Sequence, residues 1–250
     1  QAEDGIRDTS VTGVQTVLFR SIIYSKKSAS DKNYSKIVRD VNSEIPARYN
    51  SDERLLYGAS GSAGKIAVFA VRLDTYPAPK RKKVFYLGTN NPDHFWEIRK
   101  EILQKFKNLP RLGDYLHRDC YVTAQKYSKD TFVLIERLGT NFLPFLFSSK
   151  RILDLIASKI PFFSNNFSDR LMQFIGRLLP NHLPKKMDNF RDKFEHHWII
   201  EMTDEGITEA RDYFEKFFKG KKADFFECNE TESKKAMLHR YVSAGAFGRY

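Results

Sequence analysis

The sequence is short of cysteine and of long hydrophobic runs. Its two cysteines, Cys120 and Cys228, have neither the spacing of metal ligands nor that of a redox pair, so we expect a reducing, cytosolic setting. No apolar run approaches the ~20 residues that cross a bilayer, and the first residues lack the charged and apolar regions of a signal peptide. These features argue against a disulfide-rich protein, a cysteine-based metal site and a transmembrane protein.

Positive charge is what the sequence has in excess. Its 42 Lys and Arg residues outnumber 31 Asp and Glu residues and give a net charge of +11. A basic chain is expected to bind a polyanion, usually nucleic acid or anionic lipid headgroups; the alternative is a basic surface that is merely solvated. With 250 residues, 41% of them hydrophobic, the chain can form the core of one large domain or two small ones.

Residues 1–21 do not have the pattern of a folded segment. They lack helical or strand periodicity and resemble the translation of a sequencing-library adapter, which contributes nothing to a fold. The stretch contains three acidic and two basic residues. The basic character therefore belongs to the remaining residues, which we expect to be a piece of a longer natural protein.

Hydrophobic patterns along the chain predict a mixed fold. Asp93 is expected to cap a helix, and Asp52 a short helix that ends at Leu56. The apolar stretch 131–135 fits either a helix or a strand. The series of elements predicts an α+β sheet with helices on one side, interrupted by residues 110–193. Strands are expected at 66–73, 84–89, 194–202 and 223–228, and helices at 94–107, 114–127, 204–218 and 231–242.

A glycine-rich turn precedes the first of these strands. The residues from Ser60 to Gly64 are small, so their backbone can turn sharply and approach a ligand closely. A glycine-rich turn that leads into a buried strand is a common way to bring backbone N–H groups to a cofactor. The alternative is an ordinary tight turn before a core strand.

Within residues 110–193, the sequence from Asn141 onward alternates aromatic and basic side chains. Short amphipathic segments of this kind suit a membrane interface, where Phe and Leu insert and Lys and Arg meet anionic headgroups. The alternative is a helical subdomain with a basic outer surface, and no recognised motif supports nucleic acid as the partner. The prolines expected to divide this stretch into short pieces are Pro144, Pro161, Pro180 and Pro184.

Seven blocks of the sequence carry a resemblance to a known family. The blocks are IPARYN (45–50), SGSAGKIAVFAVRLDT (60–75), NLPRLGDYLHRDCY (108–121), KYSKDTF (126–132), LPKKMDNFRDKFEHH (183–197), DFFEC (224–228) and LHRYVSAGAFGRY (238–250). They resemble the bacterial quinone-dependent, FAD-containing D-lactate dehydrogenases, and the resemblance runs from about residue 30 to the last residue. Residues 60–68 are also similar to the second flavin-contacting turn of the wider FAD-linked oxidase family, with Ala63 where an acidic residue is common.

The resemblance implies a three-part peripheral membrane flavoenzyme: an FAD-binding domain, an antiparallel-sheet cap and a largely helical, basic membrane-binding insertion. It would lie at the cytoplasmic face of the bacterial inner membrane, on an anionic phospholipid surface. It would oxidise D-lactate to pyruvate and pass electrons through FAD to a membrane quinone. Nucleic acid is not expected as a partner. The implied segments are the end of the FAD domain (22–74), the first part of the cap (75–116), the insertion (117–193) and the second part of the cap (194–250).

The site residues expected from the resemblance are a base, a carboxylate clamp and a set of flavin contacts. Strand alternation places His196 and His197 on opposite faces, so only one of them can face a given pocket as the base, and a structural histidine is the alternative. Arg191 and Arg240 are the candidate clamps for the substrate carboxylate, unless they are surface charges. No metal is expected. The candidate backbone contacts to FAD are Gly61, Gly64 and Val68, and the lower-ranked site candidates are His117, Arg118 and His239.

The rival hypothesis is a non-enzymatic basic module that binds anionic membrane or nucleic acid. The enzyme hypothesis instead requires a further FAD-binding region, so we expect this chain alone to be inactive and unable to hold FAD.

Overall fold

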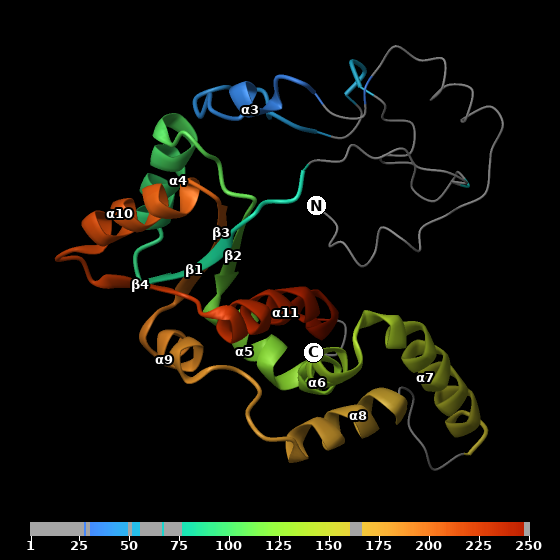
Figure 1. Cartoon of the computed structure of the whole chain (residues 1–250). Coiled ribbons are helices and arrows are strands. Elements are labelled where there is room, and N and C mark those ends of the chain that lie inside the picture. The colour runs from blue at the N-terminus through green and yellow to red at the C-terminus, as the bar shows by residue number, and fades with distance from the viewer. Residues whose placement is uncertain are drawn as a thin grey trace. The chain divides into compact units, whose positions relative to one another are not determined.

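The computed structural model describes residues 28, 31–49, 52–55, 67, 77–160 and 167–247 (Figure 1). The chain divides into two compact units, one formed by residues 1–79 and 98–109 and the other by residues 80–97 and 110–250. The predicted FAD contacts Gly61, Gly64 and Val68 lie outside the described residues, as does most of the strand predicted at 66–73.

Among the described residues of the first unit, Arg39 links two segments that are distant in the sequence. Arg39 follows the short helix α3 (Tyr34–Ile37), and its guanidinium donates hydrogen bonds to three carbonyl groups near the end of helix α4 (Asp93–Lys105). The acceptors are the carbonyls of Leu103, Phe106 and Lys107, at 3.1, 2.7 and 3.2 Å. Carbonyls at a helix C-terminus have no partner within the helix, so the arginine satisfies them.

The second unit contains a four-stranded antiparallel sheet in the order β2-β3-β1-β4. Helix α4 connects β1 to β2, and helix α10 connects β3 to β4, which is the arrangement of a split β-α-β fold. The predicted α+β class is confirmed. The strands are β1 (Lys82–Thr89), β2 (Leu112–His117), β3 (His196–Thr203) and β4 (Ala223–Glu227), and α10 is Gly206–Phe218.

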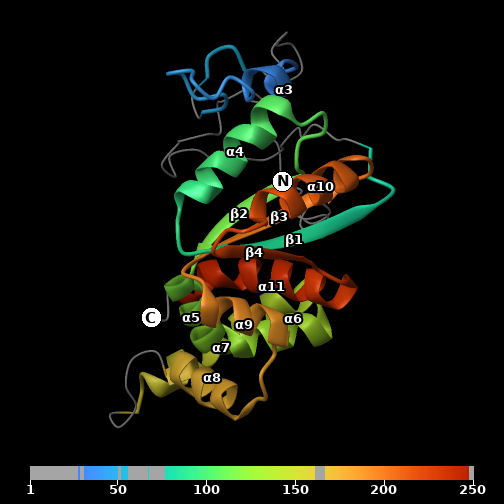
Figure 2. The ribbon, with the colours of Figure 1, turned by 90° about the vertical axis from the view of Figure 1, so that its left-hand side faces the viewer.

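Five helices and one 3-10 turn lie between β2 and β3, and a long helix follows β4. In both views α7 and α8 lie beyond α5 and α6, away from the sheet (Figures 1 and 2). These elements are α5 (Arg118–Tyr127), α6 (Lys129–Leu138), η1 (Thr140–Phe142), α7 (Leu143–Ala157), α8 (Phe167–Leu178), α9 (Lys185–Lys193) and α11 (Glu230–Phe247).

Helices cover both faces of the sheet, so the prediction of helices on one side is wrong. On one face, Phe85 of β1 contacts Phe214 of α10, with ring centroids 5.3 Å apart. On the other face, Tyr86 packs in one buried cluster with Tyr121 of α5 and Ala236 of α11. Figure 2 shows α10 on one side of the sheet and α11 with α5 on the other. The reason lies in β1, where consecutive buried residues present apolar side chains to both faces.

The predicted helix at 114–127 is wrong in its first part. Asp114 to His117 belong to strand β2, and the helix starts at Arg118. The segment pairs with β3, where Asp114 lies opposite Ile199 and Leu116 opposite His197. Pairing with a strand distant in the sequence overrides the local preference. The nitrogen Nδ1 of His117 accepts a hydrogen bond from the amide of Asp119 at 3.1 Å and so caps α5.

Other boundaries differ in detail. Asp93 is the first residue of α4 rather than its cap, and the side chain of Asn91 accepts the hydrogen bond from the Asp93 amide at 3.1 Å. Asp52 forms a turn, in which its side chain accepts from the Arg54 amide at 3.0 Å. The ambiguous stretch 131–135 lies in helix α6. Pro144 does not divide a segment, because it lies in the first turn of α7, where a missing N–H costs nothing.

Candidate functional site

The predicted alternation along β3 is confirmed by the contacts of its two histidines. His197 is fully buried and faces α5, with its ring 5.7 Å from Tyr86 and 6.0 Å from Tyr121. His196 points to the opposite face, where its ring lies 5.9 Å from the ring of Tyr115. The two candidate bases therefore occupy different environments.

The environment of His197 disfavours its charged form. Burial lowers the pKa of His197 to about 4, and the backbone of Phe194 offsets part of this effect. Neither ring nitrogen makes a well-formed hydrogen bond to a described residue. The ring is thus neutral at pH 7, but it is covered by protein on every side.

A row of buried rings continues from His197 into the helices. The ring of His239 on α11 lies 4.5 Å from that of Tyr121, and His182 lies 6.5 Å from His239. Desolvation lowers the pKa of His239 to about 3 and that of His182 to about 4. His239, a lower-ranked candidate in the sequence, is therefore part of the core, and His182 was not identified from the sequence at all.

His196 lies in a polar cluster that solvent can reach. Its Nδ1 is 2.7 Å from the hydroxyl of Tyr115, whose side chain is 55% exposed. The ring of His117 lies 5.5 Å from that of His196 and forms a 3.2 Å contact through Nε2 with Glu195. Desolvation raises the pKa of Tyr115, so its phenol keeps its proton at neutral pH. If Nδ1–H donates to the Tyr115 oxygen, the other ring nitrogen of His196 keeps a free lone pair.

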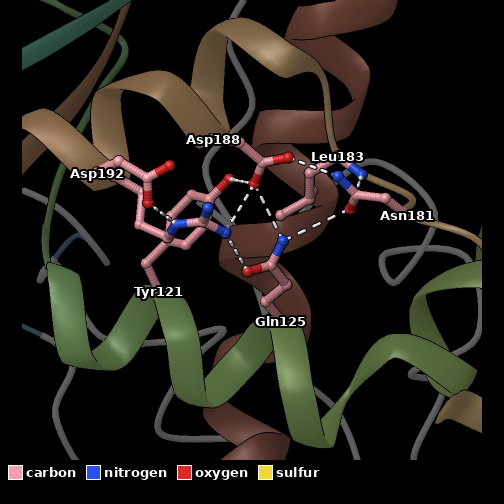
Figure 3. A network of polar contacts seen from close by, with 7 residues as sticks. Tyr121, Gln125, Asn181, Leu183, Asp188 and Asp192 are labelled. Carbon is pink, nitrogen blue, oxygen red and sulfur yellow. Dashed lines mark hydrogen bonds and ion pairs between the residues drawn. The ribbon is translucent and has the colours of Figure 1, made fainter.

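A network of polar contacts that includes Tyr121, Gln125 and Asp188 joins α9 to α5 (Figure 3). Arg191 of α9 belongs to this network. Its Nη1 donates to Asp188 at 3.0 Å and to Gln125 at 2.6 Å, and its Nε donates to Asp192 at 2.9 Å. The hydroxyl of Tyr121 donates to the same carboxylate of Asp188 at 3.3 Å. The hydrogen bond to Asp192 is the main reason that the pKa of Arg191 is raised. This candidate clamp thus already holds carboxylates of its own chain.

Arg240 also contacts a carboxylate of the chain. Its Nη1 lies 2.9 Å from Oδ2 of Asp114, which is on the same sheet face as His197. The structure therefore brings three of the predicted residues, His197, Arg191 and Arg240, to the α5 side of the sheet and leaves His196 on the other side. Glu195 precedes His196 directly in the sequence, whereas Tyr115 could have been found only with the register of β2 on β3.

The part of the chain that the structure describes contains no cluster of three or more His, Cys, Asp or Glu side chains that could hold a metal ion. Within the same residues, each helix is too short or too polar to cross a bilayer.

A second candidate site is the α7–α8 hairpin, which we define as residues 143–160 and 167–178. Its two helices carry most of the large apolar side chains that the described residues of the insertion expose to solvent. These are Phe145, Phe147, Ile152, Leu153, Leu155, Ile156, Ile160, Leu171, Phe174, Ile175 and Leu178. Many large apolar side chains exposed on two neighbouring helices indicate an interaction site.

Comparison with known proteins identifies relatives over most of the chain. The family described as "D-lactate dehydrogenase, membrane binding" matches residues 84–250. The quinone-dependent D-lactate dehydrogenase of Escherichia coli K12 is 49% identical over 90% of this chain, and that of Haemophilus influenzae is 47% identical over 88%. The Corynebacterium glutamicum protein of the same name is 36% identical over 90%. The chain spans 39% of the length of each of these relatives.

Proposed function

Because the chain belongs to the D-lactate dehydrogenase membrane-binding family, we propose that it is part of an enzyme that oxidises D-lactate to pyruvate and reduces a membrane quinone. The match over residues 84–250 carries this proposal, and the shared name of the three relatives supports it. The reaction removes two electrons and two protons from lactate. Reduction of a quinone to a quinol takes up two electrons and two protons, so the overall reaction balances.

We propose FAD as the group between lactate and quinone, since it supplies the chemistry of a hydride acceptor. Its proposed contacts are the backbone of Gly61, Gly64 and Val68. The support for them is the small, side-chain-poor turn in the sequence, because these positions lie outside the described residues.

We further propose His196 as the base that accepts the proton of the lactate hydroxyl. The supporting observations are that its cluster reaches solvent and that the Tyr115 oxygen can accept its Nδ1–H, which leaves Nε2 free to take a proton. His197 is neutral at pH 7, because burial lowers its pKa, but a substrate would have to displace packed rings to reach it. Arg191 and Arg240 lie on the α5 side of the sheet, away from His196, and each already contacts a carboxylate of its own chain. Neither is therefore proposed to clamp the carboxylate of a lactate whose hydroxyl lies at His196.

The experiment compares His196→Gln and His197→Gln in the full-length enzyme that contains this chain. We expect His196→Gln to slow flavin reduction by D-lactate about 10²- to 10⁴-fold, the usual contribution of a general base, in single-turnover absorbance measurements. His197→Gln should keep the rate and lower the stability. Tyr115→Phe should shift the pH profile of the rate, because it removes the partner that fixes the His196 tautomer. An unchanged rate in His196→Gln would exclude it as the base, and a wild-type flavin that lactate does not reduce would contradict the proposed activity.

The membrane partner is the second part of the proposal. We propose that the protein binds peripherally to an anionic phospholipid surface, at the cytoplasmic face of the inner membrane. The support is the family description together with a net charge of +11.

A further inference from the structure

A pocket of about 260 Å³ lies in the second unit, where the loop between α8 and α9 meets the start of α11. Some of its lining residues are exposed and others are buried, so it is a pit that opens to solvent. Its volume is below the ~300 Å³ at which pockets for drug-sized ligands begin, so it suits a single ring with small substituents. The exposed lining residues are Asn181, Asn229 and Thr231, the buried ones are His182, Leu183 and Glu232, and Pro184 and Lys235 are half-buried.

The loop side of the pocket is fixed by side chains from several helices. Lys129 of α6 donates a hydrogen bond to the carbonyl of Leu179. Lys235 of α11 donates to the carbonyl of His182 at 2.7 Å. Asn181 joins the network of Figure 3, where its side-chain amide donates to a carboxylate of α9. Because these bonds hold the loop from different directions, the pocket is formed before a ligand arrives.

The two charged side chains that line the pocket are paired within the chain. Glu232 contacts Lys186 at 3.5 Å and accepts a hydrogen bond from the amide of Asn229 at 2.8 Å. Lys235 contacts Glu136 at 3.0 Å. A charged ligand would compete with one of these ion pairs, whereas an uncharged ligand leaves both in place. The pocket therefore favours an uncharged ligand.

The remaining groups of the pocket match a ligand that carries carbonyl oxygens. The ammonium of Lys235 has three N–H groups, and the carbonyl of His182 and the carboxylate described above take two of them, so one can donate to a ligand. The hydroxyl of Thr231 is a second donor. Leu183 and Pro184 supply apolar walls. A quinone headgroup has this character, because it is an uncharged, flat ring with two carbonyl acceptors.

The buried side of the pocket also holds an unsatisfied polar group. His182 is only 5% exposed, and neither of its ring nitrogens has a hydrogen-bond partner among the described residues. A buried polar group of this kind points to a partner that is not part of the chain. Burial lowers the pKa of His182 to about 4, so at pH 7 one ring nitrogen donates and the other accepts. Such a ring can donate to the carbonyl of a quinone and accept from the hydroxyl of a quinol.

We propose that this pocket binds the headgroup of the membrane quinone. The inference rests on the proposed function and deepens it, because it assigns a site to the electron acceptor. Asn181 follows Leu178, the last residue of α8, by three positions, so their Cα atoms lie within about 12 Å of each other. Leu178 is 72% exposed on the apolar α7–α8 hairpin. The apolar tail of a quinone can therefore lie along the hairpin while its ring occupies the pocket.

The first test labels the full-length enzyme that contains this chain with an azido-ubiquinone under light. Mass spectrometry then locates the modified peptides. We expect labels within residues 181–184 or 229–235, and we expect an excess of short-chain ubiquinone to suppress them. Labels confined to other segments would overturn the proposal. This measurement uses the unaltered enzyme, so it does not depend on how any variant folds.

The second test blocks the pocket with Thr231→Trp, which puts a large ring at an exposed lining position. The KM for short-chain ubiquinone should rise at least about tenfold, as expected when a side chain fills part of a binding pocket. The rate of flavin reduction by D-lactate should not change. The matched control is Lys234→Trp, an exposed position of α11 outside the lining of the pocket, which should leave both parameters unchanged.

An unchanged KM in Thr231→Trp would overturn the pocket as the quinone site and leave the proposed function standing. A wild-type flavin that D-lactate does not reduce, or that quinone does not reoxidise, would overturn the proposed function and this inference with it.

Discussion

Helices α10 and α8 each carry an apolar stripe, but only one of the stripes is covered by the described residues of this chain. On α10, Phe214 and Phe218 are buried and lie 5.6 and 5.5 Å from Phe225 of the sheet. On α8, Phe174 is mostly exposed. The comparison teaches that helical periodicity identifies an apolar face without saying whether the chain's own core or an outside surface will cover it.

The difference follows from what each helix packs with. Helix α10 packs with its phenylalanines against the aromatic face of the sheet, whereas α8 packs with small residues, Ser168 and Gly176, against its neighbours. A close contact through small residues leaves the large ones for the opposite side. The hairpin therefore packs in part through small residues, while its largest apolar side chains stay exposed.

The largest difference between α10 and α8 is expected from the variants Phe214→Ala and Phe174→Ala, compared by their free energy of unfolding. Phe214 is fully buried, so its truncation should lower the free energy of unfolding by about 3–5 kcal/mol, through lost burial and a cavity. Phe174→Ala should change it by no more than about 0.5 kcal/mol, as for other surface sites. Urea unfolding followed by circular dichroism measures both. Equal losses in the two variants would mean that the hairpin side chain is also part of the core.

The second-largest effect should come from acid, which should destabilise the core beside the sheet and have no histidine to protonate in the α7–α8 hairpin. His197, His182 and His239 are buried in the sheet region with pKa values lowered to about 4, 4 and 3, whereas residues 143–178 contain no histidine. An unfolded histidine binds its proton near pH 6.5, so stability should be complete above that pH and fall as the pH drops toward 4. The loss is on the order of 3 kcal/mol for His197 alone.

The measurement is the urea midpoint at pH 7.5, 6 and 5. His239→Gln should flatten the profile, because one group that must stay neutral has been removed. A midpoint that does not change between pH 7.5 and 5 would contradict the assignment of these three histidines as neutral core residues.

The smallest effects should come from a glycine in each region. A Cβ on Gly88 of β1 would lie 2.3 Å from Cδ2 of Phe194 and 2.8 Å from Cδ1 of Phe190, so Gly88→Ala should cost about 1–3 kcal/mol through overpacking. Gly176→Ala places its methyl group in ordinary contact and should gain about 0.5–1 kcal/mol from helix propensity. Thermal unfolding measures whether each variant loses or gains stability. A Gly176→Ala variant that is less stable than the wild type would show that α8 is packed as tightly as the sheet.

Several elements of the sheet and its connecting helices could be predicted, because the sequence patterns that specify them are local. The strand expected at 223–228 and the helix expected at 204–218 are confirmed, and Gly220, with φ +77°, lies just beyond the end of α10. The failure at 114–117 has a non-local cause, since the partner strand of β2 is about eighty residues further along the chain. The prediction that helices cover only one face of the sheet was wrong for the same reason. Helix α5 belongs to the insertion between β2 and β3, helix α11 follows β4, and both pack on the second face of the sheet.

The candidate site could be predicted only in part. The alternation of β3 separates His196 from His197, and this follows from the sequence. Which of the two histidines is buried depends on where α5 and α11 pack, and no local pattern encodes that. The Tyr115 partner of His196 and the Asp188 partner of Arg191 come from other elements, so both arise from tertiary packing.

The order of elements along the chain also bears on biosynthesis. Each strand pair in the sheet joins residues far apart in sequence, whereas α7 and α8 are neighbours whose contacts close a short loop. Local contacts form faster than non-local ones, and a chain is made from its N-terminus. The α7–α8 hairpin is synthesised before β3 and β4. We therefore expect the nascent protein to form this hairpin, with its exposed apolar side chains, before it can close its sheet.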